Sequence, residues 1–187
     1  MKNKPAIIAH AQWHYVPDFL PADVADRLLD WLLHSCDWYE ETIRMFGRRV
    51  VVPRLVSHCG AKGVSYRYSG ITHRATGWPE ELMWLVPRIG ALLGQTPDFL
   101  LINRYRDGAD YMGWHRDDEP MAGAKVATLS LGSARRFLIE GAAGAASHRL
   151  ELEHGSVLVL DRCSRHSLPK TRKPVAERVS LSFRVIR

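Results

Sequence analysis

A chain of 187 residues, 46% hydrophobic and 25% charged, can form one domain with a hydrophobic core, and this composition excludes a disordered or low-complexity protein. No apolar stretch is long enough to cross a bilayer or to act as a signal peptide, and Cys36, Cys59 and Cys163 stand too far apart for a disulfide framework or a CxxC zinc site. We therefore expect a cytoplasmic protein (nuclear in a eukaryote), monomeric and without a membrane partner, whose formal net charge of +6 favours nucleic acid as a partner.

The first half of the chain contains two patterns typical of helices. Residues 20–35 (LPADVADRLLDWLLHS) have apolar residues at helical spacing, and Pro21 suits the first turn. Residues 78–94 (WPEELMWLVPRIGALLG) predict a second helix, with a kink or break at Pro87. We expect the rest of residues 1–97 to form basic loops.

After residue 98 the pattern changes to short runs rich in apolar and β-branched residues, separated by turn residues. Strands this closely spaced leave no room for helices between them, so they indicate an antiparallel sandwich or jelly roll. We expect a single domain, 1–187, with helices and loops over 1–97 and a β-roll over 98–187. The predicted strands are residues 99–106, 125–132, 135–140, 148–153, 156–160 and 177–186.

The stretch GWHRDDEP places a histidine and an aspartate two residues apart, at His115 and Asp117. In an extended segment both side chains project to one side and could bind one metal ion. Two histidines and one carboxylate form the open-sided site of non-haem iron(II) oxygenases. His166 is the best-placed third ligand, although His148 and His154 fit nearly as well by spacing, and an isolated HxD pair is more often a surface feature.

The last predicted strand, RVSLSFR, carries two arginines that are six residues apart. Arg178 and Arg184 therefore project to one face of the strand, where they would be solvated at a sheet edge or would meet an anion. An α-keto acid with a second carboxylate is such an anion, because arginine binds a carboxylate in bidentate fashion. Asn103 and Tyr105, two apart in NRYR, could hydrogen-bond the same molecule.

Together these motifs resemble the AlkB family of iron(II)- and 2-oxoglutarate-dependent dealkylases. The resemblance covers about residues 53–186 and rests on NRYRDGADYMGWHRDDEP, ATLSLGSARRFLIE, HGSVLVL, HSLPK and RVSLSFRVI in this order. It implies a mainly β, α+β fold: a double-stranded β-helix (jelly roll) core with N-terminal helices. It implies that the cofactors are Fe(II), 2-oxoglutarate and O2. The implied iron ligands are His115, Asp117 and His166, and the implied 2-oxoglutarate residues are Asn103, Tyr105, Arg178, Arg184 and Ser180.

The sequence departs from this family at two positions. Only residues 161–165 separate the strand SVLVL from His166, where the family carries a longer loop, so the placement of His166 is open. Ser180 stands where some members have an asparagine, which changes one contact near the cosubstrate.

The segments MFGRRVVVPR and YRYSG resemble the branch that repairs alkylated duplex DNA. In that branch an apolar residue wedges into the base stack, an aromatic residue and the first iron-ligand histidine sandwich the flipped base, and polar groups read its edge. A base methylated at a Watson–Crick nitrogen is cationic, which would account for the acids beside the proposed iron site. The implied substrate residues are Phe46 (wedge), Tyr68 (sandwich), Tyr66, Asp118 and Glu119 (base edge) and Arg54 (lesion pocket).

The resemblance implies that the chain removes methyl groups from N1-methyladenine and N3-methylcytosine in DNA and releases formaldehyde. Arg48, Arg49 and Arg54 could bind phosphates or be ordinary solvated residues. Two other hypotheses remain: an RNA or single-strand demethylase, for which a wedge would be idle, and a non-catalytic nucleic-acid-binding β-roll whose site is degenerate or filled by zinc.

Overall fold

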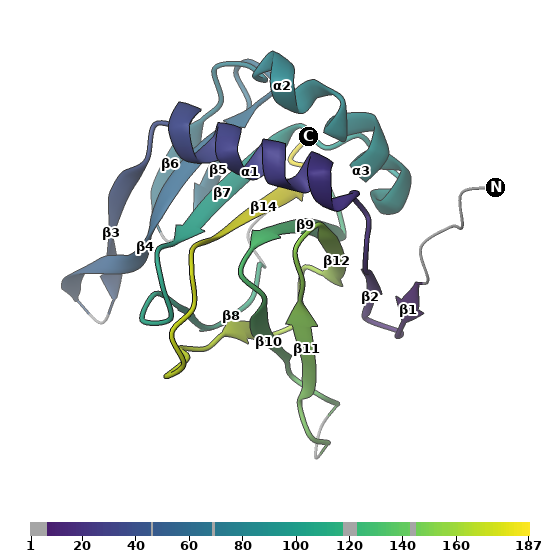
Figure 1. The fold of residues 1–187 in the computed structure, drawn as a ribbon. Coiled ribbons are helices and arrows are strands. Elements are labelled where there is room, and N and C mark those ends of the chain that lie inside the picture. The colour runs from purple at the N-terminus through teal and green to yellow at the C-terminus, as the bar shows by residue number, and fades with distance from the viewer. Residues whose placement is uncertain (1–6, 46, 69, 118–122, 143–144) are drawn as a thin grey trace.

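The computed structural model describes residues 7–45, 47–68, 70–117, 123–142 and 145–187. Two antiparallel sheets face each other, and helices cover the outer face of the larger sheet (Figure 1). This arrangement confirms the predicted jelly-roll core. None of the helices in the described ranges has the length and apolar character needed to span a membrane.

The larger sheet has eight strands in the order β1-β2-β12-β9-β14-β7-β4-β3. Its central strands, β9, β14 and β7, belong to the runs predicted from the alternating pattern, so the sequence located the middle of the sheet correctly. The strands are β1 (Ile8–Ala9), β2 (Trp13–Val16), β3 (Tyr39–Met45), β4 (Arg48–Gly60), β7 (Phe99–Tyr105), β9 (Lys125–Gly132), β12 (Ser156–Asp161) and β14 (Arg178–Arg184).

The smaller sheet has four strands in the order β11-β10-β13-β8, and two further strands form a separate hairpin. The strands of the smaller sheet are β8 (Met112–His115), β10 (Arg135–Ile139), β11 (His148–Leu152) and β13 (His166–Leu168). The separate hairpin consists of β5 (Ser65–Tyr68) and β6 (Ile71–Arg74). Strands β8 and β13 were not predicted, because runs of three or four residues are too short to show a period.

The helices are α1 (Ala22–Ser35), α2 (Glu80–Met83) and α3 (Leu85–Leu93). The break in the second predicted helix lies at Trp84, not at Pro87 as predicted. Pro87 is the third residue of α3, and a proline in the first turn removes no intrahelical hydrogen bond, so the helix continues through it. The helix ends at Gly94, whose φ of 73° allows the left-handed C-cap.

The expectation of loops between the N-terminal helices is wrong. Residues 39–60 form two long strands, and β4 pairs with β7 inside the larger sheet, while β2 pairs with β12 near the opposite edge. The basic stretch was read as a loop because its arginines interrupt the apolar alternation. Tertiary pairing with β7 supplies the backbone hydrogen bonds that this sequence pattern did not indicate.

Strand β14 shows how the fold builds a cavity. Val179, Leu181 and Phe183 belong to the core beneath α1 and α3, whereas the alternate residues of the strand face the space between the sheets. Both faces of β14 are therefore buried, which explains why every residue of the strand is inaccessible. The residues on the second face are Arg178, Ser180, Ser182 and Arg184.

Candidate metal and cosubstrate site

The three residues predicted to bind iron come together at one end of the smaller sheet. His115 ends β8, His166 begins β13, and the two are register partners. Asp117 follows β8, and its backbone N–H donates to the carbonyl of Arg162 at 3.0 Å. One ligand atom from each of the three side chains lies within 4.8 Å of the other two. This cluster can therefore present two imidazoles and one carboxylate to a single cation.

The structure also resolves the choice of the third histidine within this cluster. The short connection over residues 161–165 is a tight turn, closed by a hydrogen bond from Ser164 N–H to the Asp161 carbonyl at 2.9 Å, and it still delivers His166 to the cluster. His148 packs instead against Trp13, with ring centroids 5.7 Å apart. His154 accepts a hydrogen bond from the backbone N–H of Gly132 at the end of β9, and it is not part of the cluster.

Backbone carbonyls select the tautomer of both histidines. Nδ1 of His115 donates to the carbonyl of Gly113 at 2.9 Å, and Nδ1 of His166 donates to the carbonyl of Ser164 at 2.8 Å. Each Nε2 therefore carries a lone pair, as a metal ligand requires, and each ring is held in place by its second nitrogen. The donor set and its supporting hydrogen bonds fit a ferrous ion.

The charges around the cluster favour a deprotonated set of ligands. Desolvation and the neighbouring His166 lower the pKa of His115 to about 4, so that the ring is neutral at physiological pH. Burial alone would raise the pKa of Asp117, but Arg184 and the two histidines lower it overall. Nη2 of Arg184 donates to Oδ1 of Asp117 at 3.1 Å. Oδ2, on the other side of the carboxylate, lies 4.0 Å from Nε2 of His166.

Arg178 is a buried cation without an acidic partner among the described residues. Its side chain is 2% exposed, and its Nη2 donates to the hydroxyl of Ser130 at 2.9 Å, while its Nε has no hydrogen-bond partner. Desolvation lowers the pKa of Arg178 to about 10. A carboxylate entering the cavity would relieve this cost, so the site fits one end of a dicarboxylic acid.

The two arginines are therefore not equivalent, a distinction that sequence spacing did not show. Arg184 is hydrogen-bonded to Asp117, whereas Arg178 lies at the other end of the same strand with its guanidinium 5.3 Å from the ring of Tyr105. Both line one cavity, and neither is solvated, because β14 lies between β9 and β7 rather than at an edge.

Asn103, Tyr105 and Ser180 line the same cavity, as their register on β7 and β14 dictates. The Oδ1 of Asn103 accepts a hydrogen bond from Nε of Arg54 at 2.8 Å. Arg54 is only 3% exposed, so it lies behind Asn103 and not at the surface, where a phosphate would bind. Arg48 and Arg49, by contrast, are exposed on β4.

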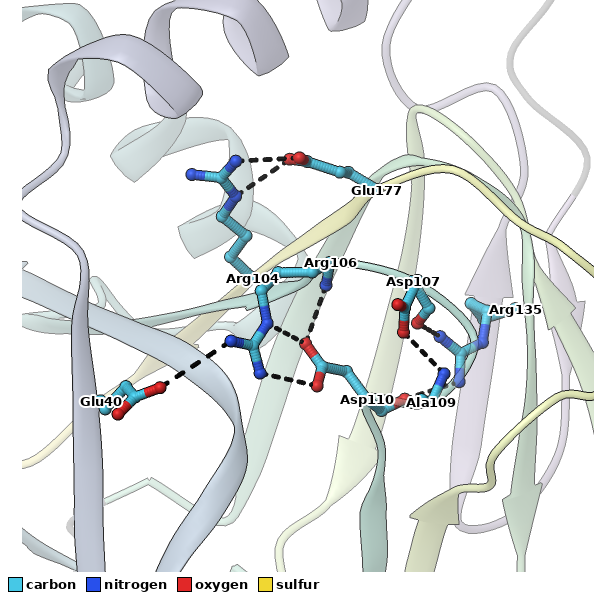
Figure 2. A network of polar contacts seen from close by, with 8 residues as sticks. All are labelled: Glu40, Arg104, Arg106, Asp107, Ala109, Asp110, Arg135 and Glu177. Atoms are coloured by element: carbon cyan, nitrogen blue, oxygen red, sulfur yellow. Dashed lines mark hydrogen bonds and ion pairs between the residues drawn. The ribbon is translucent and has the colours of Figure 1, made fainter.

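A network of polar contacts surrounds the turn that follows β7 (Figure 2). Arg106 contacts both carboxylate oxygens of Asp110, at 2.8 and 2.9 Å. Arg135, which is 2% exposed, donates to the carbonyls of Asp107, Asp110 and Pro169, each at 2.9 Å.

Arg135 was not predicted as a site residue. Its three acceptors lie in the turn between β7 and β8 and just after β13, so one guanidinium ties together the segments that flank Tyr105, His115 and His166. A buried cation that binds only backbone carbonyls leaves no trace in sequence spacing. The pair RR at 135–136 gave no hint which arginine points inward.

Two of the aromatic residues predicted to contact the base, Tyr68 and Tyr66, differ in their relation to the cavity. Tyr68 lines the cavity beside His115, and its hydroxyl contacts the sulfur of Met112 at 3.9 Å. Tyr66 is 1% exposed and lies under Arg184, whose guanidinium is 5.0 Å from its ring. Tyr66 therefore does not line the cavity. It belongs to a second hydrophobic cluster, which consists of Val52, Val56, Val64, Tyr66, Tyr68, Ala75, Phe99 and Leu101. Phe46, Asp118 and Glu119 lie outside the described residues.

Comparison with known proteins places this geometry in a family. The sequence profile of the 2OG-Fe(II) oxygenase superfamily matches residues 12–184. The chain belongs to this superfamily. The solved structure of OsALKBH1 superimposes with a TM-score of 0.67 and 16% identity, covering 96% of this chain and 100% of that chain, which concerns the fold alone.

Curated relatives of this 2OG-Fe(II) oxygenase confirm the resemblance to the AlkB family. The DNA oxidative demethylase ALKBH2 of Bos taurus is 37% identical over 158 residues, which are 77% of this chain and 57% of that protein. The human ALKBH2 is 36% identical, over 77% of this chain and 60% of that protein. The human alpha-ketoglutarate-dependent dioxygenase alkB homolog 3 is 30% identical, over 91% of this chain and 64% of that protein. The chain thus spans about three fifths of these relatives' length.

Proposed function

We propose that this chain is an iron(II)- and 2-oxoglutarate-dependent dealkylase that repairs N1-methyladenine and N3-methylcytosine in DNA, with duplex DNA as the preferred substrate. The observation that carries the proposal is one cavity that holds both the His115–Asp117–His166 cluster and the buried, acid-free guanidinium of Arg178. The similarity to DNA oxidative demethylases supports the choice of substrate.

In the proposed reaction, an N-methyl group, O2 and 2-oxoglutarate give N–H, formaldehyde, succinate and CO2. The iron would supply activation of O2, which the protein alone cannot provide. Asp117 and the two Nε2 atoms would hold the metal, and Arg184 would keep Asp117 deprotonated and oriented. Arg178, with Tyr105 beside it, would bind the far carboxylate of 2-oxoglutarate, and Asn103 and Ser180 would contact the same molecule.

On the substrate side, Tyr68 and His115 would stack on the two faces of an extruded base. A methylated base pairs badly, so it costs less to extrude from a duplex than a normal base. Asp118 and Glu119 would complement its positive charge, with Tyr66 and Arg54 close behind.

The preference for duplex DNA is supported by the hairpin of β3 and β4. Phe46 falls between these two strands in the sequence, and the exposed residues Arg44 and Arg49 of the two strands are register partners. Val50 and Val51 of β4 are 38% and 52% exposed. Exposed arginines next to apolar side chains suit a surface that neutralises phosphates while an apolar residue enters the base stack.

The test measures succinate and formaldehyde with oligonucleotides that carry one N1-methyladenine, in duplex and in single-stranded form. We expect formaldehyde in step with succinate, and Asp117→Ala should abolish both, because the metal loses its carboxylate. Phe46→Ala should lower the duplex rate about tenfold and leave the single-strand rate nearly unchanged.

The results that contradict the proposal differ for its two parts. If wild-type protein with Fe(II) never consumes 2-oxoglutarate, the enzyme proposal is wrong and the non-catalytic alternative stands. If Phe46→Ala lowers both rates equally, the wedge and the duplex preference are wrong, while demethylation itself is unaffected.

A further inference from the structure

A cluster of four titratable side chains, two buried and two half-buried, lies outside the cavity, where the hairpin of β5 and β6 meets β3 and β4. Tyr39 and Glu41 come from β3, His58 from β4 and His73 from β6. None of the four was singled out from the sequence, and none lines the cavity. Because the hairpin is a separate two-stranded sheet, no backbone ladder joins it to β3 or β4 (Figure 1).

The four side chains form a continuous chain of polar contacts. The hydroxyl of Tyr39 lies 3.1 Å from Nδ1 of His58 and 3.3 Å from Nδ1 of His73. The Nε2 of His73 lies 3.1 Å from Oε1 of Glu41, and both of these side chains are only 3% exposed. The rings of His58 and His73 are in edge contact, with centroids 5.0 Å apart.

Counting hydrogens along this chain assigns the donors. The ring of His58 also bonds the backbone of Arg74 and is neutral, because desolvation and the neighbouring His73 lower its pKa. The nitrogen that faces the backbone carbonyl must carry the hydrogen, so Nδ1 of His58 accepts from the hydroxyl of Tyr39. The oxygen of Tyr39 must then accept from Nδ1–H of His73.

This assignment leaves one proton to be placed between His73 and Glu41. With its Nδ1 already a donor, a neutral His73 would present a lone pair at Nε2 to a carboxylate oxygen 3.1 Å away. Neither of these two buried atoms has a hydrogen-bond partner among the described residues, so their contact is an ion-pair distance and not a hydrogen bond. Two bare acceptors would repel each other there, so the pair carries a second hydrogen, on Nε2 of His73 or on Glu41. In either case the cluster as a whole is neutral.

We propose that the buried pair of His73 and Glu41, with Tyr39 and His58 behind it, is a positioning device that fixes the hairpin of β5 and β6 relative to the cavity. The inference rests on the proposed function, since the hairpin carries Tyr68, the proposed stacking residue. His73 and Tyr68 lie on opposite strands of one tight hairpin, so fixing the ring of His73 to Glu41 fixes the strand that presents Tyr68 to His115.

Apolar packing alone does not specify the position of the hairpin as this pair does. The hairpin is also held by Tyr66 and Tyr68, which pack with Phe99 and with aliphatic side chains of β4 and β7. Such contacts tolerate small sliding movements, whereas a histidine and a carboxylate buried 3.1 Å apart lose their mutual compensation when they separate. The pair therefore affects how tightly the substrate is held more than whether the cavity forms.

The first test reads the proton directly, by long-range ¹H–¹⁵N NMR correlation of the histidine rings in the full chain. Wild-type His73 should carry hydrogen on Nδ1 and share a second one at Nε2. In Glu41→Gln the amide can donate to Nε2, so His73 should become a neutral ring with hydrogen on Nδ1 alone. A wild-type His73 that is neutral with its hydrogen on Nε2 would overturn the proposal.

The second test measures KM separately for methylated duplex DNA and for 2-oxoglutarate. Glu41→Ala should raise the KM for DNA about tenfold, while 2-oxoglutarate consumption without DNA stays at the wild-type rate. Glu41→Gln should keep the KM for DNA within about twofold of wild type, because it retains the hydrogen-bonded chain. Tyr39→Phe keeps the contact between His73 and Glu41 and removes only the hydroxyl behind it. This variant replaces Glu41→Ala in the test if Glu41→Ala does not fold.

The matched control is Glu40→Ala, one residue away on β3, with a side chain 64% exposed. It should change neither KM. If Glu41→Ala raises the KM of DNA and of 2-oxoglutarate equally, or lowers only the thermal stability, the pair has no positioning role. Should wild-type protein not demethylate DNA at all, the proposed function fails, whereas the NMR assignment of the proton is decided independently.

Discussion

The two faces of strand β14 are both buried, but one is apolar and the other is polar. One face presents Val179, Leu181 and Phe183 to the helices, where the three side chains are fully buried among aliphatic neighbours. The other face presents arginines and serines to the cavity, equally buried but polar.

Successive residues of β14 thus alternate between a role in stability and a place in the cavity. Burial of the apolar face stabilises the fold by removing hydrocarbon from water. Burial of Arg178 on the other face costs free energy until an anion arrives. Adjacent residues of β14 therefore have opposite effects on stability. Substitutions on the apolar face should lower stability, and substitutions of Arg178 on the polar face should instead weaken the binding of 2-oxoglutarate.

The largest effect is expected from Phe183→Ala on the helix face. Removing a fully buried phenylalanine should lower the free energy of unfolding by about 3–5 kcal/mol, because the transfer free energy is lost and a cavity remains. Denaturant unfolding measures this loss. The folded fraction should still bind 2-oxoglutarate normally, and a selective loss of binding would contradict the separation of the two faces.

Arg178→Met on the cavity face should do the reverse. We expect the Kd for 2-oxoglutarate to rise about hundredfold, since a buried carboxylate would lose its cation. The thermal stability of the protein without ligand should stay the same or increase, because an unpaired buried charge is replaced by an apolar side chain of similar length. Calorimetric titration with 2-oxoglutarate and Mn(II) measures the binding without turnover. Unchanged affinity would remove Arg178 from the site.

The smallest effect concerns the turn between β7 and β8, where Arg106 binds Asp110 (Figure 2). Burial would raise the pKa of Asp110, but the bonds from Arg106 lower it overall, so its stabilisation is present above the ordinary carboxyl value and is lost as pH falls through the lowered one. Asp110→Asn should cost about 1 kcal/mol at pH 7, because Arg106 is partly solvent-exposed, and the difference should vanish near pH 2.

Melting temperatures of wild type and Asp110→Asn from pH 2 to 7 test this sign. Glu40→Gln is the control, because Glu40 lies 3.9 Å from the same arginine but is 64% exposed. A gap between wild type and Asp110→Asn that widens in acid would contradict the assignment of the pKa shift.

Much of the core and of the site could be predicted from local patterns. The period-two alternation located the central strands, and the same alternation placed Arg178 and Arg184 on one face. The spacing of His115 and Asp117 indicated a shared metal, and the third ligand followed only from the order of motifs. These predictions depend on neighbours within a few residues, which is the range over which sequence reports backbone geometry.

Residues whose role depends on distant partners escaped prediction. Arg135 was indistinguishable from Arg136 until its three carbonyl acceptors, from two separate segments, came together. Glu41 and His73, 32 positions apart, carry no motif. Strands β3 and β4 were taken for loops, although β4 pairs with the distant strand β7 and β3 pairs in turn with β4.

By itself the sequence determined which residues alternate, where the central strands of the larger sheet lie and which side chains could bind a metal and a dicarboxylic acid, because these follow from the period of the backbone. The tertiary structure decided which histidine lies with His115 and Asp117, which of two arginines lacks an acidic partner among the described residues, and which buried side chains meet between β3 and β6. Those outcomes depend on distances between segments far apart in the chain, and no local pattern of residues contains them.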